Sequence, residues 1–489
     1  MRRRVLVRVG TAVAAVLAAS GAVASVTRAA GQAASANVAS TVTVDLSASQ
    51  GAFPFAPGGQ LSATPNSWRY GPSTMDELSA LRLQRARVWL RFTDTVDPAT
   101  GTPDYAKWYD YLATYSSLAD SVLVNWSSGY DTLVGGGSWT PDRLFAAERD
   151  MLAHYKARYP RIQYLEVENE AVPSTADVPG YYRKYQLMYR VVNAVNALGL
   201  PGPAIQVGGP TLDVFSTARL GAFLDAYKAD ADTAKRLDFV SYHQYLINIS
   251  GTGDWTANKD YPAIVKTEKA GVDGLLSARG LAARPVLVTE TGVFPGTRES
   301  SLGLSADWHI QAAALASLRY WYLQQGGIVP FDWTIDHPDN DRKDLFADTG
   351  TGVARPYYDM VRAMAMLPGT RYRATSDQLS SRGTGVYGLA AANATTVAAL
   401  TWNYQWTGQQ GYDSRVVFTN LPAAFRSSNV RVTRYRVPAD ADSDASPLTP
   451  VETFVVGPRT AGSYYGQTLP LLPNELRLTT LTPTTDPVT

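Results

Sequence analysis

The chain has 489 residues, of which 45% are hydrophobic and 11% aromatic, so it can bury a large core and divide into two or three domains. Its 44 Lys and Arg against 43 Asp and Glu give a formal charge of +1. This balance argues against a general nucleic-acid binder, because phosphate contacts need a basic excess. The absence of cysteine excludes disulfides, zinc thiolate sites and thiol catalysis.

Residues 1–34 are predicted to be a signal peptide and a disordered leader. Four arginines among the first eight residues precede an apolar stretch from Val9 to Ala24, and Ala22-Val23-Ala24 offers a cleavage site. The alternative, a transmembrane anchor, is disfavoured because the run is shorter than the roughly 18 strongly apolar residues that a span needs. No later segment is apolar for long enough either, so we expect a secreted protein.

Residues 35–65 are interpreted as an N-terminal strand and a lead-in. Thr41 to Leu46 alternate small polar and apolar residues, the period of a strand with one buried face. We expect this strand to pair with strands near the end of the chain.

Residues 66–368 alternate strand and helix patterns. The expected strands begin near Trp68 and continue with Ala86–Leu90, Ser121–Trp126, Tyr164–Val167, Ala204–Val207, Asp238–Ser241, Val286–Thr289 and Ile328–Trp333. The expected helices are Pro141 to about Tyr159, Tyr181–Leu198, Arg219–Lys228, Pro262–Arg279, Asp307–Gln325 and Pro356–Met366, with another ending near Arg82. Eight such units over about 300 residues predict an α/β fold, a (β/α)8 TIM barrel.

Residues 369–489 lose the helical period and show short β-branched or aromatic runs between turn residues. The expected strands are Val397–Tyr404, Arg415–Thr419, Val430–Val437, Thr453–Val456 and Glu475–Leu481. This pattern predicts a C-terminal antiparallel β-sandwich domain.

Two acids directly follow strands of the predicted barrel, where TIM-barrel chemistry is located. The fourth strand leads into Glu166-Val167-Glu168-Asn169-Glu170, and the seventh leads into Thr289-Glu290. Either glutamate alone could be a solvated loop acid. Opposite walls of a barrel can instead hold one protonated and one ionised carboxyl across a sugar, as glycoside hydrolysis requires.

Four motifs resemble, in order, those of the clan A retaining glycoside hydrolases, and most closely family 39, which includes β-xylosidases and α-L-iduronidases. The motifs are Val167-Glu168-Asn169-Glu170, Val207-Gly208-Gly209-Pro210-Thr211, Asp238 to Tyr245 and Val288-Thr289-Glu290. The resemblance spans the mature chain, because the family also carries a C-terminal β-sandwich. The chain departs from the family at Glu168 and Ala171, where Trp and Pro are common, and at Gln244, where a second His is usual.

The resemblance implies catalytic roles for Glu170 as acid/base and Glu290 as nucleophile. It further implies that Asn169 donates to the sugar 2-hydroxyl, a contact that strengthens in the transition state. His243 and Tyr245 would lie beside the nucleophile, with Tyr245 as the likelier donor to Glu290; a structural core histidine is the alternative for His243.

Two further substrate-binding residues are predicted from their places at strand ends. Trp333, closing the eighth strand, is the candidate aromatic floor under the sugar ring, with plain core packing as the alternative. Arg87 or Arg91, at the second strand, is expected to orient a sugar hydroxyl or a carboxylate.

No cofactor or metal is expected. The four histidines lack ligand spacing, and Gly208-Gly209 lacks the rest of a dinucleotide fingerprint. In the loop after the eighth strand, the sequence places Asp336, Asp339, Asp341 and Asp344. This loop is interpreted as solvated, with calcium binding or a substrate subsite as alternatives.

Together these features predict a secreted retaining glycoside hydrolase, exo-acting on oligo- or polysaccharides through two glutamates. An endo-acting polysaccharidase of the same clan and a non-catalytic carbohydrate-binding protein are the alternatives. In each case the expected partner is a carbohydrate, with neither nucleic acid nor a membrane span involved.

Overall fold

The computed structural model describes residues 36–64, 68–247, 258–293, 308–337, 344–438, 448–458 and 465–489. The signal peptide predicted over residues 1–34 lies outside these ranges. The chain from Asn37 to Thr489 forms one compact unit. Within the described ranges, we find no helix that combines the length and apolar character needed to cross a membrane.

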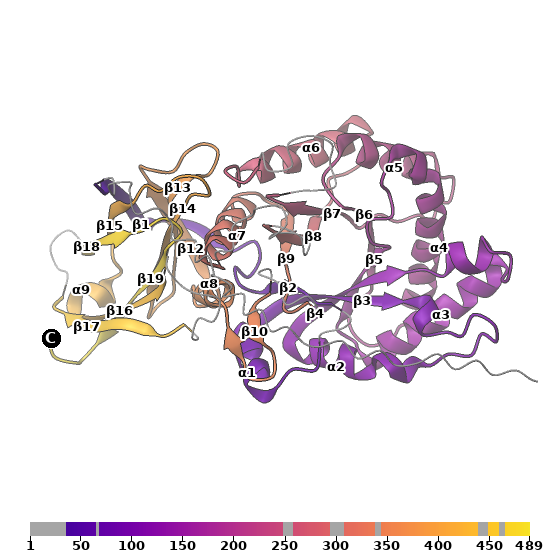
Figure 1. Ribbon diagram of the computed structural model, residues 1–489, viewed down its shortest axis with the longest axis horizontal. Helices are drawn as coiled ribbons and strands as arrows, with labels where there is room; N and C mark the ends of the chain where they lie inside the picture. Colours follow the sequence, from indigo (N-terminus) through magenta and orange to yellow (C-terminus); the bar gives the residue numbers. More distant parts are fainter. Residues whose placement is uncertain are drawn as a thin grey trace, which may run out of the picture. The chain divides into compact units, whose positions relative to one another are not determined.

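Eight parallel strands close into a barrel, and Figure 1 shows them as a ring with helices outside it. The strands are β2 (Gln60–Ser62), β3 (Leu83–Arg91), β4 (Ala119–Ser127), β5 (Ile162–Val167), β6 (Gln206–Leu212), β7 (Phe239–Tyr245), β8 (Val286–Gly292) and β9 (Ile328–Trp333). Each strand pairs with the next along the chain, and β2 pairs with β9 to close the ring. The predicted TIM barrel is therefore confirmed.

The helices of the barrel follow its strands along the chain. They are α1 (Pro72–Ala80), α2 (Tyr109–Leu118), α3 (Pro141–Arg158), α4 (Val178–Asn196), α5 (Thr217–Ala229), α6 (Ile264–Ala278), α7 (Trp308–Leu323) and α8 (Pro356–Ala365). Helix α3 begins where the sequence predicts, because Thr140 caps it by accepting from the backbone N–H of Arg143 and Pro141 occupies the first turn.

The first barrel strand differs from the prediction. It is β2, at Gln60–Ser62, so the barrel begins before residue 66 and inside the segment interpreted as a lead-in. A fully buried strand of three residues is too short to show a period. Trp68 instead lies outside any strand and packs edge-on against Tyr111, with ring centroids 6.3 Å apart.

The remaining large sheet has nine strands in the order β17-β16-β19-β14-β13-β12-β1-β15-β18. Their bounds are β1 (Val38–Ala52), β12 (Thr370–Ser376), β13 (Gly385–Ala392), β14 (Val397–Tyr404), β15 (Tyr412–Thr419), β16 (Asn429–Val437), β17 (Pro450–Val456), β18 (Tyr465–Leu471) and β19 (Leu476–Thr484). All neighbours are antiparallel except β1 and β15. The sheet curls around its own apolar core, as the predicted sandwich requires.

Strand β1 joins the N-terminal end of the described chain to this C-terminal sheet. It pairs with β12 on one side and with β15 on the other, and in Figure 1 it lies, in indigo, among orange and yellow strands. The alternating Val42 and Val44 are fully buried in the core of the sheet. The barrel therefore begins only after the chain has contributed a strand to the other sheet.

The sheet also packs against the barrel helix α7. The indole N–H of Trp402 donates to the hydroxyl of Ser317 over 2.9 Å, and the rings of Trp402 and Tyr387 stack 4.7 Å apart. The Trp321 N–H donates to the hydroxyl of Tyr387 over 3.1 Å. Buried aromatic contacts of this kind add to the apolar area removed from water and hold the sheet against the helix.

Candidate active site

The interior of the barrel is layered because inward-facing residues recur every second position along a strand. One layer is apolar and is formed by Leu123, Tyr164, Phe239, Leu287, Phe331 and Val329. Two residues further toward the carboxyl ends, the corresponding positions are polar or amphipathic: Asn125, Glu166, Ser241, Thr289 and Trp333. The apolar layer closes the floor of the barrel, and the next layer supports a site at its mouth.

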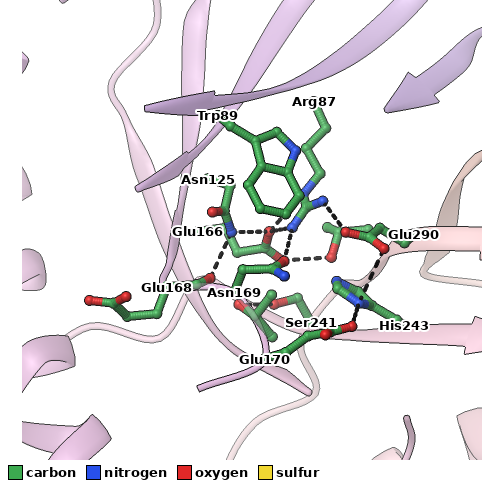
Figure 2. Close-up of polar contacts among 12 residues, drawn as sticks. Arg87, Trp89, Asn125, Glu166, Glu168, Asn169, Glu170, Ser241, His243 and Glu290 are labelled. Carbon is green, nitrogen blue, oxygen red and sulfur yellow. Dashed lines mark hydrogen bonds and ion pairs between the residues drawn. The ribbon is translucent and has the colours of Figure 1, made fainter. Parts of the chain in front are cut away.

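Arg87, on β3, is the central cation of this site and is fully buried. Its guanidinium donates to three groups: Glu166 over 2.9 Å, Glu290 over 2.8 Å and the side-chain oxygen of Asn169 over 2.8 Å (Figure 2). Arg91, the other candidate, is 64% exposed and faces Asp94 over 3.7 Å. The structure therefore places Arg87, and not Arg91, in the site.

Glu166, on β5, lies beneath the mouth of the barrel and is fully buried. Besides Arg87, it accepts from the hydroxyl of Thr289 over 2.7 Å and from the side-chain amide of Asn125 over 3.1 Å. Burial raises the pKa of Glu166, but the charges of Arg87 and His243 outweigh burial and hold this pKa below its usual value. Glu166 is therefore ionised at neutral pH.

Glu170 and Glu290 converge from opposite sides of the mouth, as Figure 2 shows. One oxygen of each carboxylate and one nitrogen of His243 all lie within 4.8 Å of one another. Glu290 is 5% exposed and accepts from the hydroxyl of Tyr245 over 2.8 Å. The side chain of Glu170 is 41% exposed, so this carboxyl is the one open to solvent.

Local backbone geometry brings Glu170 and Glu290 to the mouth of the barrel. Glu168 and Glu170 both have left-handed φ angles, 58° and 52°, which interrupt the period of two after β5 ends. The Glu170 N–H donates to the carbonyl of Thr211 over 3.0 Å, which ties this turn to β6. On β8, the pairing with its neighbours shifts around Glu290, so this residue faces the mouth although Thr289 also faces the interior.

His243 lies between the two carboxylates and is fully buried. Its Nδ1 is 2.8 Å from Glu170 and 3.6 Å from Glu290. Burial lowers the pKa of His243, but Glu290 and Glu170 more than offset this and raise it. Conversely, burial raises the pKa of Glu170, and the hydrogen bond with His243 brings it below its usual value. The contact between them therefore favours a protonated His243 beside an ionised Glu170.

Two indole rings line the same mouth. Trp333 is 7% exposed, and its ring lies 6.1 Å from that of Trp89 at an interplanar angle of 54°. Trp89 is half-buried, and the Arg87 guanidinium lies 4.6 Å from its ring centre. Trp89, Glu166, Asn125 and Thr289 were not singled out as site residues by sequence reasoning. The period of two on β3, which carries Arg87 and then Trp89 inward, is the signal that could have found Trp89.

Two parts of the chain offer acidic side chains to a cation. The donor atoms of Glu170, His243 and Glu290 are close enough to hold a metal ion, although Arg87 already pairs with Glu290 over 2.8 Å. Of the aspartates in the loop after β9, Asp339 and Asp341 lie outside the described residues.

A second acidic group lies behind β5, on the side of helices α3 and α4. Glu148 is fully buried and accepts from the Ser128 hydroxyl over 2.7 Å and from the Gly129 N–H over 3.0 Å. Burial raises the pKa of Glu148 to about 8. Glu168 faces Lys184, 3.9 Å away, and burial raises the pKa of Glu168 to about 6. The side-chain acceptors of Arg87 are Glu166, Glu290 and Asn169, so Glu148 and Glu168 form a group separate from the mouth.

The fold is similar to several solved structures. A glucosidase from Croceicoccus marinus matches with a TM-score of 0.68 and 15% identity, over 92% of this chain and 100% of that one. A GH39 enzyme from Xanthomonas axonopodis pv. citri matches with a TM-score of 0.66 and 17% identity, over 93% of this chain and 99% of that one. A monomeric β-xylosidase from Caulobacter crescentus matches with a TM-score of 0.63 and 15% identity, over 91% of this chain and 99% of that one. No protein-family model and no curated protein matches the chain. At such identities the likeness establishes the shared fold, a barrel with an accompanying β-sandwich.

Proposed function

We propose that the chain is a retaining glycoside hydrolase, with Glu290 as nucleophile and Glu170 as acid/base. The observation that carries the proposal is the approach of their carboxylate oxygens to within 4.8 Å at the mouth of the barrel. Retaining glycosidases hold their two carboxyls about 5–5.5 Å apart, whereas inverting enzymes leave about 6.5–9.5 Å for a water. The names of the similar structures, a glucosidase, a β-xylosidase and a GH39 enzyme, support the same class.

In the first step, the Glu290 carboxylate attacks the anomeric carbon while the bond to the leaving oxygen breaks. Glu170 gives that oxygen a proton, which His243 can supply across the 2.8 Å contact. In the second step, Glu170 takes a proton from water, and the resulting hydroxide displaces Glu290 from the sugar. Two inversions at one carbon retain its configuration.

The surroundings of Glu290 suit a nucleophile that must stay ionised and oriented. Arg87 and Tyr245 each donate to one of its two oxygens over 2.8 Å. Asn169 accepts from Arg87 through its oxygen, so its amide N–H groups are directed away from the arginine and can donate to a sugar 2-hydroxyl. Trp333, with Trp89 beside it, would form the floor of the glycone site.

We further propose that the enzyme is secreted and removes sugars from chain ends. The basic and apolar leader at residues 1–34 supports export. Exo action is supported by the resemblance to family 39 and by the names of the glucosidase and the β-xylosidase. An endo-acting enzyme of the same clan would instead release oligosaccharides, and a carbohydrate-binding protein would release nothing.

The test is a screen of aryl glycosides and polysaccharides with the secreted form, followed by proton NMR of the first product on the best substrate. We expect a monosaccharide whose anomeric configuration matches the substrate. A 2-deoxy-2-fluoro glycoside of the same sugar should label the peptide that contains Glu290, as read by mass spectrometry. Initial inversion, or labelling elsewhere, would contradict the mechanism; tight binding without turnover would favour the carbohydrate-binding alternative.

A further inference from the structure

The Arg87 guanidinium bridges two carboxylates, and only one of them has a role in the proposed reaction. Glu290 takes one nitrogen of the fork over 2.8 Å, while Glu166 takes two, each over 2.9 Å. Glu166 is fully buried, so it cannot touch a sugar. A buried charge of this kind is costly unless it is paired, and Arg87 supplies the pairing directly beneath the nucleophile.

From these contacts, which rest on the proposed function only for their catalytic meaning, we propose that Glu166 is a positioning residue for Glu290. It fixes the Arg87 fork so that one nitrogen reaches Glu290 and another reaches Asn169, and its negative charge offsets part of the arginine's positive charge. Glu290 is thereby held by Arg87 without losing the basicity that a nucleophile needs.

The hydrogen bonds of Glu166 set the orientation of the Arg87 guanidinium. Glu166 Oε2 accepts from Nε and Nη2 of Arg87, which fixes the plane of the guanidinium and leaves Nη1 for Glu290. Thr289 holds the other oxygen of Glu166 over 2.7 Å, and Thr289 directly precedes Glu290 on β8. Glu166 therefore contacts both the arginine and the strand that carries the nucleophile.

The groups around Glu166 and Glu290 determine how the negative charge of Glu166 acts on Glu290. Glu166 faces Arg87 from β3, Asn125 from β4, Thr289 from β8 and the charge of His243 from β7. Glu290 is faced by Arg87, Tyr245, His243 and Glu170. Arg87 is the only one of these groups that is charged at every accessible pH, and it pairs with both carboxylates.

A glutamine at position 166 can separate charge from geometry. Its carbonyl can occupy the Oε2 position and accept from Arg87 and Asn125, while its amide donates to Thr289, whose hydroxyl can turn to accept. Glu166→Gln therefore keeps the contacts and removes one negative charge. Glu166→Asp keeps the charge and shortens the reach. Glu148→Gln is the matched control, because Glu148 is equally buried at the same end of the barrel but does not contact Arg87.

The readout is the titration of the Glu290 carboxyl by carbon-13 NMR of glutamate-labelled full-length mature protein. The Glu290 resonance is assigned by its loss in Glu290→Gln. We expect the titration midpoint of Glu290 to fall by about one pH unit in Glu166→Gln, because a neighbouring anion that disfavours ionisation is gone. Glu148→Gln and Glu166→Asp should leave the midpoint near its wild-type value.

Kinetics provide a second readout that a purely structural role would not move. In Glu166→Gln, the acid limb of the pH dependence of kcat/KM should shift to lower pH by the same amount, and kcat should fall about tenfold as Glu290 becomes less basic. An unchanged or raised Glu290 midpoint in a folded Glu166→Gln protein would overturn the proposal. Should Glu166→Gln not fold, a Glu290 midpoint displaced in Glu166→Asp would overturn the proposal. Absence of glycosidase activity with the expected midpoint shift would refute the proposed function and leave the positioning role in place.

Discussion

Glu166 and Glu148 are both completely buried at the carboxyl end of the barrel, yet their surroundings set opposite protonation states. Inside the barrel, Glu166 meets a guanidinium and two neutral donors, and its pKa falls below the usual value although burial raises it. Between the strands and the helices, Glu148 accepts from a hydroxyl and a backbone N–H, and burial raises its pKa to about 8. Burial alone therefore does not mark a functional carboxylate, because the nearest cation decides whether it carries charge.

The two regions should respond very differently to loss of one carboxyl. Glu290→Gln removes the proposed nucleophile, so kcat should fall by more than about 10⁴-fold, as when a covalent catalyst is removed elsewhere. Glu148→Gln replaces a protonated carboxyl with a neutral amide and should keep kcat within about twofold of wild type at pH 6. Steady-state kinetics on the best aryl glycoside would measure kcat of both variants. Comparable losses of kcat would contradict the difference expected between the two regions.

Within the mouth of the barrel, a smaller effect is expected from a single hydroxyl. Tyr245→Phe removes the 2.8 Å hydrogen bond to Glu290, and kcat should fall about tenfold, since a hydrogen bond to a charged group contributes roughly 1.5–3 kcal/mol. Tyr242→Phe is the control, because Tyr242 is equally buried on the same strand but its hydroxyl faces Glu268 rather than Glu290. A Tyr245→Phe enzyme with wild-type kcat would show that this contact is not used in the reaction.

Replacing Glu148, behind β5, should change the stability of the protein rather than its catalytic rate. Glu148 has a raised pKa of about 8, so the folded protein binds a proton that the unfolded chain has lost. Its contribution is fully present below the unfolded pKa near 4.5 and decreases as pH rises toward about 8. The free energy of unfolding should change by at most about 1.4 kcal/mol per pH unit from this group. Urea denaturation between pH 5 and 9 should show a flatter dependence for Glu148→Gln, and an identical slope would contradict this account.

The fold could be predicted from the sequence where a strand is long or strongly patterned. Strand β14 begins and ends at the predicted residues, Val397 and Tyr404. The prediction missed β12, β13 and β18 for local reasons. Strand β13 is rich in Gly and Ala, which signal strands weakly, while β18 is an edge strand that contains Pro470. It also missed the barrel strand β2, whose three residues show no period.

The site residues also differ in whether the sequence could predict them. Glu170 and Glu290 could be proposed because each directly follows an apolar strand, and a barrel brings such ends together. Glu166 could not be distinguished from Glu168 in the sequence, because the partner that separates them, Arg87, lies 79 positions earlier and the turn after β5 breaks the strand period. Contacts between strands, rather than any local motif, decide which of these four glutamates face the mouth.

The most direct test of the assigned roles is the stereochemistry of azide rescue. Glu170→Ala should still form the glycosyl-enzyme from an activated aryl glycoside, because a good leaving group needs little protonation. Azide should then displace Glu290 and give a glycosyl azide of retained configuration. In Glu290→Ala, azide can act only in place of the nucleophile and should give the inverted product. NMR of the two azides would settle the assignment: these outcomes are what the account predicts, and their exchange between the variants, or equal unrescued activity in both, would contradict it.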